Sequence, residues 1–111
     1  MRAILIPADE TLPVQDVQIP DDPTKILDAL QQLVDGDIQF IPYPGRLDVS
    51  VYCNEEGKLR RLPANPRATD LMRNILLATD FLVGDVVVCG TDPQTGETAD
   101  LPDLPALQQL M

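Results

Sequence analysis

The sequence predicts an α+β fold, with a small mixed or mainly antiparallel sheet of five to six strands covered by two helices. Short runs that are apolar throughout or alternate with polar residues recur between turn signals, which is typical of strands. Two other segments repeat their apolar residues at helical spacing, each after a capping residue and a proline. The chain has 111 residues, 44% of them hydrophobic, which is enough for one buried core without a disulfide or a metal.

The N-terminal residues predict a hairpin. Residues 3–6 are apolar throughout and end at Pro7, as expected of a strand covered on both faces. Residues 14–19 place Val17 and Ile19 on one face and polar residues on the other. This second stretch is expected to pair back on the first as a half-exposed strand.

The first helix is predicted over residues 23–35. Asp22 can cap it because its carboxylate accepts hydrogen bonds from unpaired amides, and Pro23 suits the first helical position. Gly36 is expected to end it. Its apolar stripe consists of Ile26, Leu27, Leu30, Leu33 and Val34.

Two further strands are predicted at residues 38–41 and 47–53. The segment Pro-Tyr-Pro-Gly-Arg between them forces a turn, so they should pair. In the second strand Val49, Val51 and Cys53 share the covered face. Residues 58–62 follow as a short basic strand or extension, whose charges suit an exposed sheet edge.

The second helix is predicted from Pro66 through about Ala78, with Asn65 as its cap. Its buried stripe would be Leu71, Met72, Ile75 and Leu76. Gly84 precedes an all-apolar strand at residues 86–89, which is expected in the middle of the sheet beside residues 3–6.

The predicted domain organisation is a single α+β domain at residues 1–100 followed by a leucine- and proline-rich tail at residues 101–111. This tail could form one helical turn or two, although Pro102 and Pro105 disfavour a longer helix. Its leucines either dock on the domain or serve a partner, and both alternatives stay open.

The composition excludes several kinds of chemistry. There is no histidine, which removes the usual general base and the usual activator of a serine or cysteine nucleophile. No glycine pattern of a phosphate-binding loop occurs, and no calcium-loop pattern is present. We therefore expect no catalytic residue, cofactor or metal. Because the N-terminal apolar run is short and no stretch of about 18 apolar residues occurs, a cytoplasmic protein without membrane contact is expected.

The two cysteines, Cys53 and Cys89, are too few for a zinc site made of thiolates. Both lie in apolar stretches that are predicted as strands. Buried free thiols are the favoured interpretation. The alternative is a disulfide between neighbouring strands, which would require a secreted protein.

Charge is distributed unevenly along the chain. The formal net charge is −10, which disfavours general nucleic-acid binding. The basic residues between positions 46 and 73 are either a solvated surface or an interaction patch for an acidic partner or a phosphate group. The acidic remainder either confers solubility or imitates a phosphate backbone. The possible interaction patch comprises Arg46, Lys58, Arg60, Arg61, Arg67 and Arg73.

Three segments carry a family resemblance. They are AILIPADETLPVQDVQI, VYCNEEGKLRRLPANPRAT and FLVGDVVVCG. The most specific part joins a turn at residues 54–57 to a Pro-x-Asn-x-x-Ala-Thr pattern at residues 63–69. Over residues 2–98 the chain resembles the domain of unknown function 3846 family, which comprises small proteins and domains of bacteria, phages and plasmids. The resemblance implies a genetic setting near accessory or anti-defence genes, and it implies no activity.

These observations predict a non-enzymatic accessory protein of mobile-element or phage type that acts by binding another protein. The first alternative is an acidic DNA mimic that inhibits a nuclease or restriction enzyme. The second is an enzyme of unknown type with a polar site where two loops converge. That site would contain Asn54, Glu55, Asn65, Arg67 and Thr69.

Overall fold

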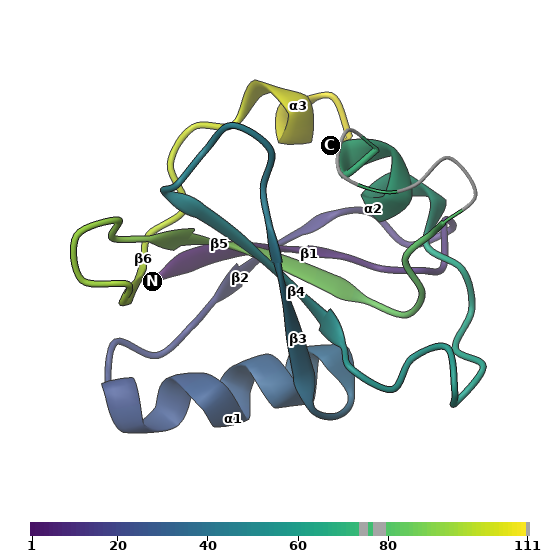
Figure 1. Ribbon diagram of the computed structural model, residues 1–111, viewed down its shortest axis with the longest axis horizontal. Coiled ribbons are helices and arrows are strands. Elements are labelled where there is room, and N and C mark those ends of the chain that lie inside the picture. Colours follow the sequence, from purple (N-terminus) through teal and green to yellow (C-terminus); the bar gives the residue numbers. More distant parts are fainter. Residues whose placement is uncertain (74–75, 77–79, 111) are drawn as a thin grey trace.

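A computed structural model describes residues 1–73, 76 and 80–110, and it shows one antiparallel sheet with helices on both faces (Figure 1). The strand order is β2-β1-β5-β4-β3, and β6 pairs with β5. The strands are β1 (Arg2–Ile6), β2 (Gln15–Gln18), β3 (Ile38–Pro42), β4 (Val49–Asn54), β5 (Val86–Thr91) and β6 (Thr98–Ala99). The helices are α1 (Pro23–Val34), α2 (Pro66–Leu71) and the short α3 (Pro105–Gln108). The predicted α+β class is confirmed.

Each face of the sheet has its own hydrophobic core. On one face, Leu30 and Val34 of α1 pack against the central strands, while α2 and α3 lie over the opposite face (Figure 1). Residues of β1 and β5 contribute to both cores in alternation, as Val87 and Val88 do. This double burial explains why both strands are apolar throughout. The predicted pairing of β1 with β5 and the hairpin of β1 with β2 are confirmed.

Helix α1 begins as predicted, but the residue that ends it differs from the prediction. The Asp22 carboxylate accepts a hydrogen bond from the Thr24 amide at 3.0 Å. At the other end Asp35, with a φ of 60°, takes the left-handed conformation, and the Gly36 amide donates to the Gln31 carbonyl at 3.0 Å. An aspartate therefore occupies the position that glycine was expected to fill.

Helix α2 is shorter than predicted. Asn65 caps it and Pro66 begins it, but it ends at Leu71, so the prediction of a helix through Ala78 is wrong. The Asn65 amide donates to the Leu82 carbonyl at 2.8 Å, so the chain must return to the start of the helix by residue 82. Since the Leu82 amide also donates to Thr69 Oγ1 at 2.9 Å, this return ends against the first turn of α2. A helix through residue 78 would leave only four residues, almost fully extended, to make it. Of the predicted stripe, Met72 is buried, and Ile75 lies outside the described residues.

Residues 58–62 form a compact turn, so the prediction of a basic strand or extension is wrong. The Leu62 amide donates to the Gly57 carbonyl at 3.0 Å, and the Arg61 amide donates to the Lys58 carbonyl at 3.2 Å. Arg61 has a φ of 56°, which completes the pattern that closes many helix ends. These local hydrogen bonds satisfy the backbone of the segment without a neighbouring strand.

The C-terminal leucines dock on the domain. Leu101, Leu104 and Leu107 are buried in the core beneath α2 and α3. The Leu101 amide donates to the Arg2 carbonyl at 3.0 Å, which ties the segment to β1. Of the two alternatives that the sequence left open for these leucines, the structure shows docking. Within the described residues, no helix has the length and hydrophobicity needed to cross a membrane.

Candidate functional site

The predicted interaction patch is divided along β4. Arg46 precedes this strand, whereas Lys58 follows it, so the two side chains belong to opposite ends of the sheet. Arg46 holds both carboxylate oxygens of Asp48, at 2.8 and 2.9 Å, and this contact lowers the pKa of Asp48. Arg46 is therefore separated from the rest of the patch and already paired with a carboxylate.

Two other residues of the patch meet at one aspartate. Lys58 forms an ion pair with the carboxylate of Asp80, and Arg73 donates to the Asp80 carbonyl at 3.2 Å. The hydrogen bond from Lys58 is the main cause of the lowered pKa of Asp80. Lys58 Nζ also lies 5.0 Å from the centre of the Phe81 ring, within the range of a cation–π contact.

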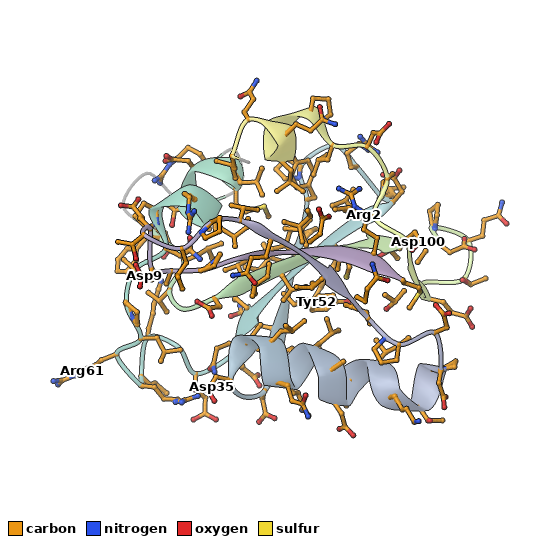
Figure 2. All side chains as sticks on the ribbon, turned by 180° about the vertical axis from the view of Figure 1, so that it is seen from behind. Arg2, Asp9, Asp35, Tyr52, Arg61 and Asp100 are labelled. Carbon is orange, nitrogen blue, oxygen red and sulfur yellow. The ribbon has the colours of Figure 1, made fainter. Side chains whose placement is uncertain are left out.

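The remaining arginines of the patch differ in their roles. Arg60 pairs with the Asp35 carboxylate at 3.1 Å. Arg67 reaches the first loop, where its Nη2 donates to the carbonyl of Pro7 at 2.7 Å and to that of Asp9 at 3.1 Å. The Arg61 side chain points outward from the molecule (Figure 2). Carboxylates and carbonyls thus hold five of the six basic side chains.

Asn54, from the alternative polar site, joins α1 to β4. It is buried, and its Nδ2 donates to the carbonyls of Val34 at 3.1 Å and Asp35 at 2.9 Å. Its Oδ1 accepts from the Glu56 amide at 2.8 Å. These contacts satisfy the orphan carbonyls at the end of α1, so the side chain has a structural role.

Asn65 and Thr69 form a second buried junction. Asn65 Nδ2 donates to the carbonyls of Ile6 at 2.8 Å and Gly84 at 2.9 Å, while its Oδ1 accepts from the Ala68 amide at 3.1 Å. Thr69 Oγ1 donates to the Asn65 carbonyl at 2.8 Å and accepts from the Leu82 amide at 2.9 Å. The polar atoms of these two side chains are engaged with the backbone of the protein.

The cysteines are free and buried, as the favoured interpretation predicted. Cys53 faces the core beneath α2, and Cys89 faces the core beneath α1, so the sheet separates them. This placement rules out the alternative disulfide between them. Burial raises the pKa of both thiols, and that of Cys89 rises to about 12.

The thiols are expected to be poorly reactive in the folded protein. At pH 8 the Cys89 thiolate should be roughly a thousandfold scarcer than that of a thiol with the ordinary pKa. Labelling with iodoacetamide followed by mass spectrometry measures this. Cys89 should stay unmodified in buffer, whereas both cysteines should be modified in urea. Rapid modification of Cys89 in buffer would contradict its burial.

A hollow lies beside β3, on the face that α2 and α3 cover. We call it the β3 groove; it has a volume of about 410 Å³. The groove is surrounded by strand β3, the end of β4, the turn at residues 57–59, and Leu76, Asp80 and Val83. Its lining includes Gln39, Phe40, Ile41, Cys53, Lys58 and Leu59.

Exposed apolar side chains gather at this groove. Leu59 is 85% exposed and lines the groove. Phe40, which is 54% exposed, belongs to the bordering strand β3, but its side chain lies on the other face of the sheet, beside Tyr52. The exposed Phe81 contacts Lys58, which also lines the groove. This surface cannot be recognised from the sequence, in which Leu59 falls in a predicted basic edge strand and Phe40 in a predicted paired strand.

An aromatic pair lies on the other face of the same edge. The rings of Phe40 and Tyr52 lie 5.9 Å apart at their centres, and Tyr52 is partly buried against the core beneath α1. Leu27, at 53% exposure, and Ile38 line a neighbouring hollow with Tyr52. The edge of the sheet at β3 therefore carries apolar side chains on both faces.

Comparison with known proteins places nearly the whole chain in one family. The family model described as domain of unknown function (DUF3846) matches residues 1–110. The chain belongs to the DUF3846 family. The DUF3846 match extends beyond the region of resemblance in the sequence and includes the docked C-terminal leucines. No curated protein and no solved structure matches the chain.

Proposed function

We propose that this DUF3846 protein is a non-enzymatic accessory factor that acts by binding another protein. The observation that carries the proposal is the group of exposed apolar side chains at the β3 edge, with Leu59 at the β3 groove and Phe40 on the opposite face. Exposed apolar groups around a hollow are a common feature of protein-binding surfaces, because their burial against a partner is favourable. The phage or mobile-element setting implied by the family resemblance is part of this proposal.

Other features of the site support binding over catalysis. Asn54, Asn65 and Thr69 use their polar atoms to hold helix ends and strand ends in place. The buried thiols have raised pKa values, which disfavours the thiolate that a cysteine nucleophile needs. The apolar groups at the groove offer contact area and no reactive atom.

Two leucines provide a matched test of the proposal. Leu59 and Leu47 are almost equally exposed, at 85% and 86%, but only Leu59 lies in the β3 groove. In affinity purification from host lysate, the wild-type protein and Leu47→Ser are expected to retain the same partner. Leu59→Ser should lose most of it, because the substitution removes apolar area at the contact.

The same experiment has outcomes that would contradict the proposal. If the wild-type protein enriches no protein above the background at low and moderate salt, binding of a partner protein is not its function. If Leu59→Ser and Leu47→Ser retain the partner equally, the β3 groove is not the contact. Displacement of the partner by DNA would instead favour the alternative of an acidic DNA mimic.

A further inference from the structure

Resting on the proposed function, we infer that the outer edge of β3 binds an extended, basic segment of the partner by strand addition. The added strand would run antiparallel to β3 and continue the sheet. Its side chains would enter the β3 groove on one face and pack against the Phe40–Tyr52 pair on the other. Four sets of observations support this inference.

The first is the direction of the backbone groups in β3. The Glu55 amide donates to the Asp37 carbonyl at 2.8 Å, so these two residues form a hydrogen-bonded pair. Because such pairs alternate along an antiparallel ladder, Gln39 and Ile41 direct their amides and carbonyls toward β4. Ile38 and Phe40 direct theirs outward. Within the described residues no strand lies on that outer side.

The second is the pair of surfaces that an added strand would meet. Residues opposite Gln39 and Ile41 would point to the groove side, because directly paired residues share a face. Residues opposite Phe40 would point to the aromatic side, where Phe40 is half exposed. One extended segment can therefore use both apolar surfaces at once through its alternating side chains.

The third is the contrast with the other edge of the sheet. Strand β2 exposes Gln15, Asp16 and Gln18, and Asp16 is paired with Arg2 at 2.9 Å. Charged and polar groups of this kind protect an edge from pairing with other chains. Strand β3 has no charged residue between Ile38 and Pro42. Of the edges formed by β2 and β3, it is the β3 edge that offers backbone groups next to apolar contact area.

The fourth is the charge at the two ends of β3, which indicates the charge expected of the added segment. Asp37 and Glu55 lie side by side at the start of β3, and neither forms an ion pair within the described part of the chain. At the other end Arg46 is neutralised by Asp48. An antiparallel segment would bring its C-terminal end to Asp37, so basic residues are expected there. A second copy of this chain, with a net charge of −10, is disfavoured as the occupant.

A synthetic peptide tests the inference directly. The probe is an acetylated peptide of alternating valine and threonine that ends in two lysines. It is expected to bind with a dissociation constant below about 1 mM in fluorescence anisotropy. Hydrogen exchange should slow by roughly tenfold or more at the amides of Ile38 and Phe40, because they become hydrogen bonded. The amides of Gln39 and Ile41, already in the ladder with β4, should not change.

Two control peptides separate the backbone contribution from the charge. N-methylation of alternate peptide amides on the pairing side should weaken binding by roughly tenfold, because it removes the donors. Replacing the two lysines with glutamates should weaken it by a similar factor at low salt. Equal binding of the methylated peptide would overturn strand addition, and equal binding of the glutamate peptide would overturn the basic segment.

Further outcomes distinguish this inference from the proposed function. If the lysine peptide does not bind at about 1 mM, or binds without protecting Ile38 and Phe40, strand addition is overturned. Loss of the partner by Leu59→Ser in affinity purification would still support protein binding in that case. A dimer in sedimentation of the protein alone, with the two amides already protected, would identify a second copy as the occupant and overturn the inference.

Discussion

Replacing Asn65 with alanine is expected to destabilise the protein by about 4 kcal/mol, because three buried backbone groups would lose their partner. The side chain is fully buried and joins β1, the chain before β5 and the first turn of α2. Such a loss is a large part of the stability of a domain of this size, which is roughly 5 to 15 kcal/mol. Urea unfolding followed by circular dichroism measures the change.

Asp22 provides the matched control, because it caps α1 in the same way and also precedes a proline. It is exposed and joins no distant segments, so Asp22→Ala should cost much less. Asn65→Asp keeps an oxygen for the cap but loses both donors and buries a carboxylate, so it should be no more stable than Asn65→Ala. Equal losses for Asn65→Ala and Asp22→Ala would show that the junction adds nothing beyond a helix cap.

Replacing Gly90 with alanine is expected to cost about 3 kcal/mol or more and to release the C-terminal segment. A Cβ atom there would collide with the Asp100 carbonyl oxygen and would lie 2.6 Å from its carbonyl carbon and 2.8 Å from the Ala99 oxygen. These are backbone atoms of β6 and of the residue that follows it, so this segment must move. Urea unfolding measures the loss, and limited proteolysis after residue 100 measures the release.

Gly45 is the control for this substitution. It has a φ of 74° and nothing within 4 Å of an added Cβ atom, so Gly45→Ala tests the backbone cost alone. That cost is expected to be roughly 1 kcal/mol. If Gly90→Ala is as stable as Gly45→Ala and equally resistant to protease, close packing of β6 on β5 does not hold the C-terminal segment in place.

Elements with local signals were predicted correctly. Asp22 with Pro23, and Asn65 with Pro66, predict helix starts because the cap and the proline act on amides within three residues. Alternation along β4 predicts that Val49, Val51 and Cys53 share a covered face, and it places Cys53 correctly. The expectation that β4 is covered on one side only is wrong, because Ser50 on its other face is also buried. Strands β1 and β5 are apolar at successive positions, which predicts that both of their faces are buried, as the structure shows.

The candidate site could be predicted only in part. The basic residues are visible in the sequence. Their neutralisation is not visible there, because the partners Asp80 and Asp35 are distant along the chain. Phe40 reads as an ordinary strand residue, and nothing near it in the sequence shows that β3 is an edge. The β3 groove depends on the compact turn that carries Lys58 and Leu59 beside that edge.

By itself, the sequence determined the class of the fold, the starts of the two main helices and the burial of β1 and β5 on both faces. Tertiary structure alone decided the end of α2, the docking of the C-terminal leucines and the exposed surface at β3. The physical reason is the range of the interactions. Caps and alternation act between neighbours, whereas the hydrogen bond from Asn65 to Leu82 and the packing of Leu107 join residues that only folding brings together.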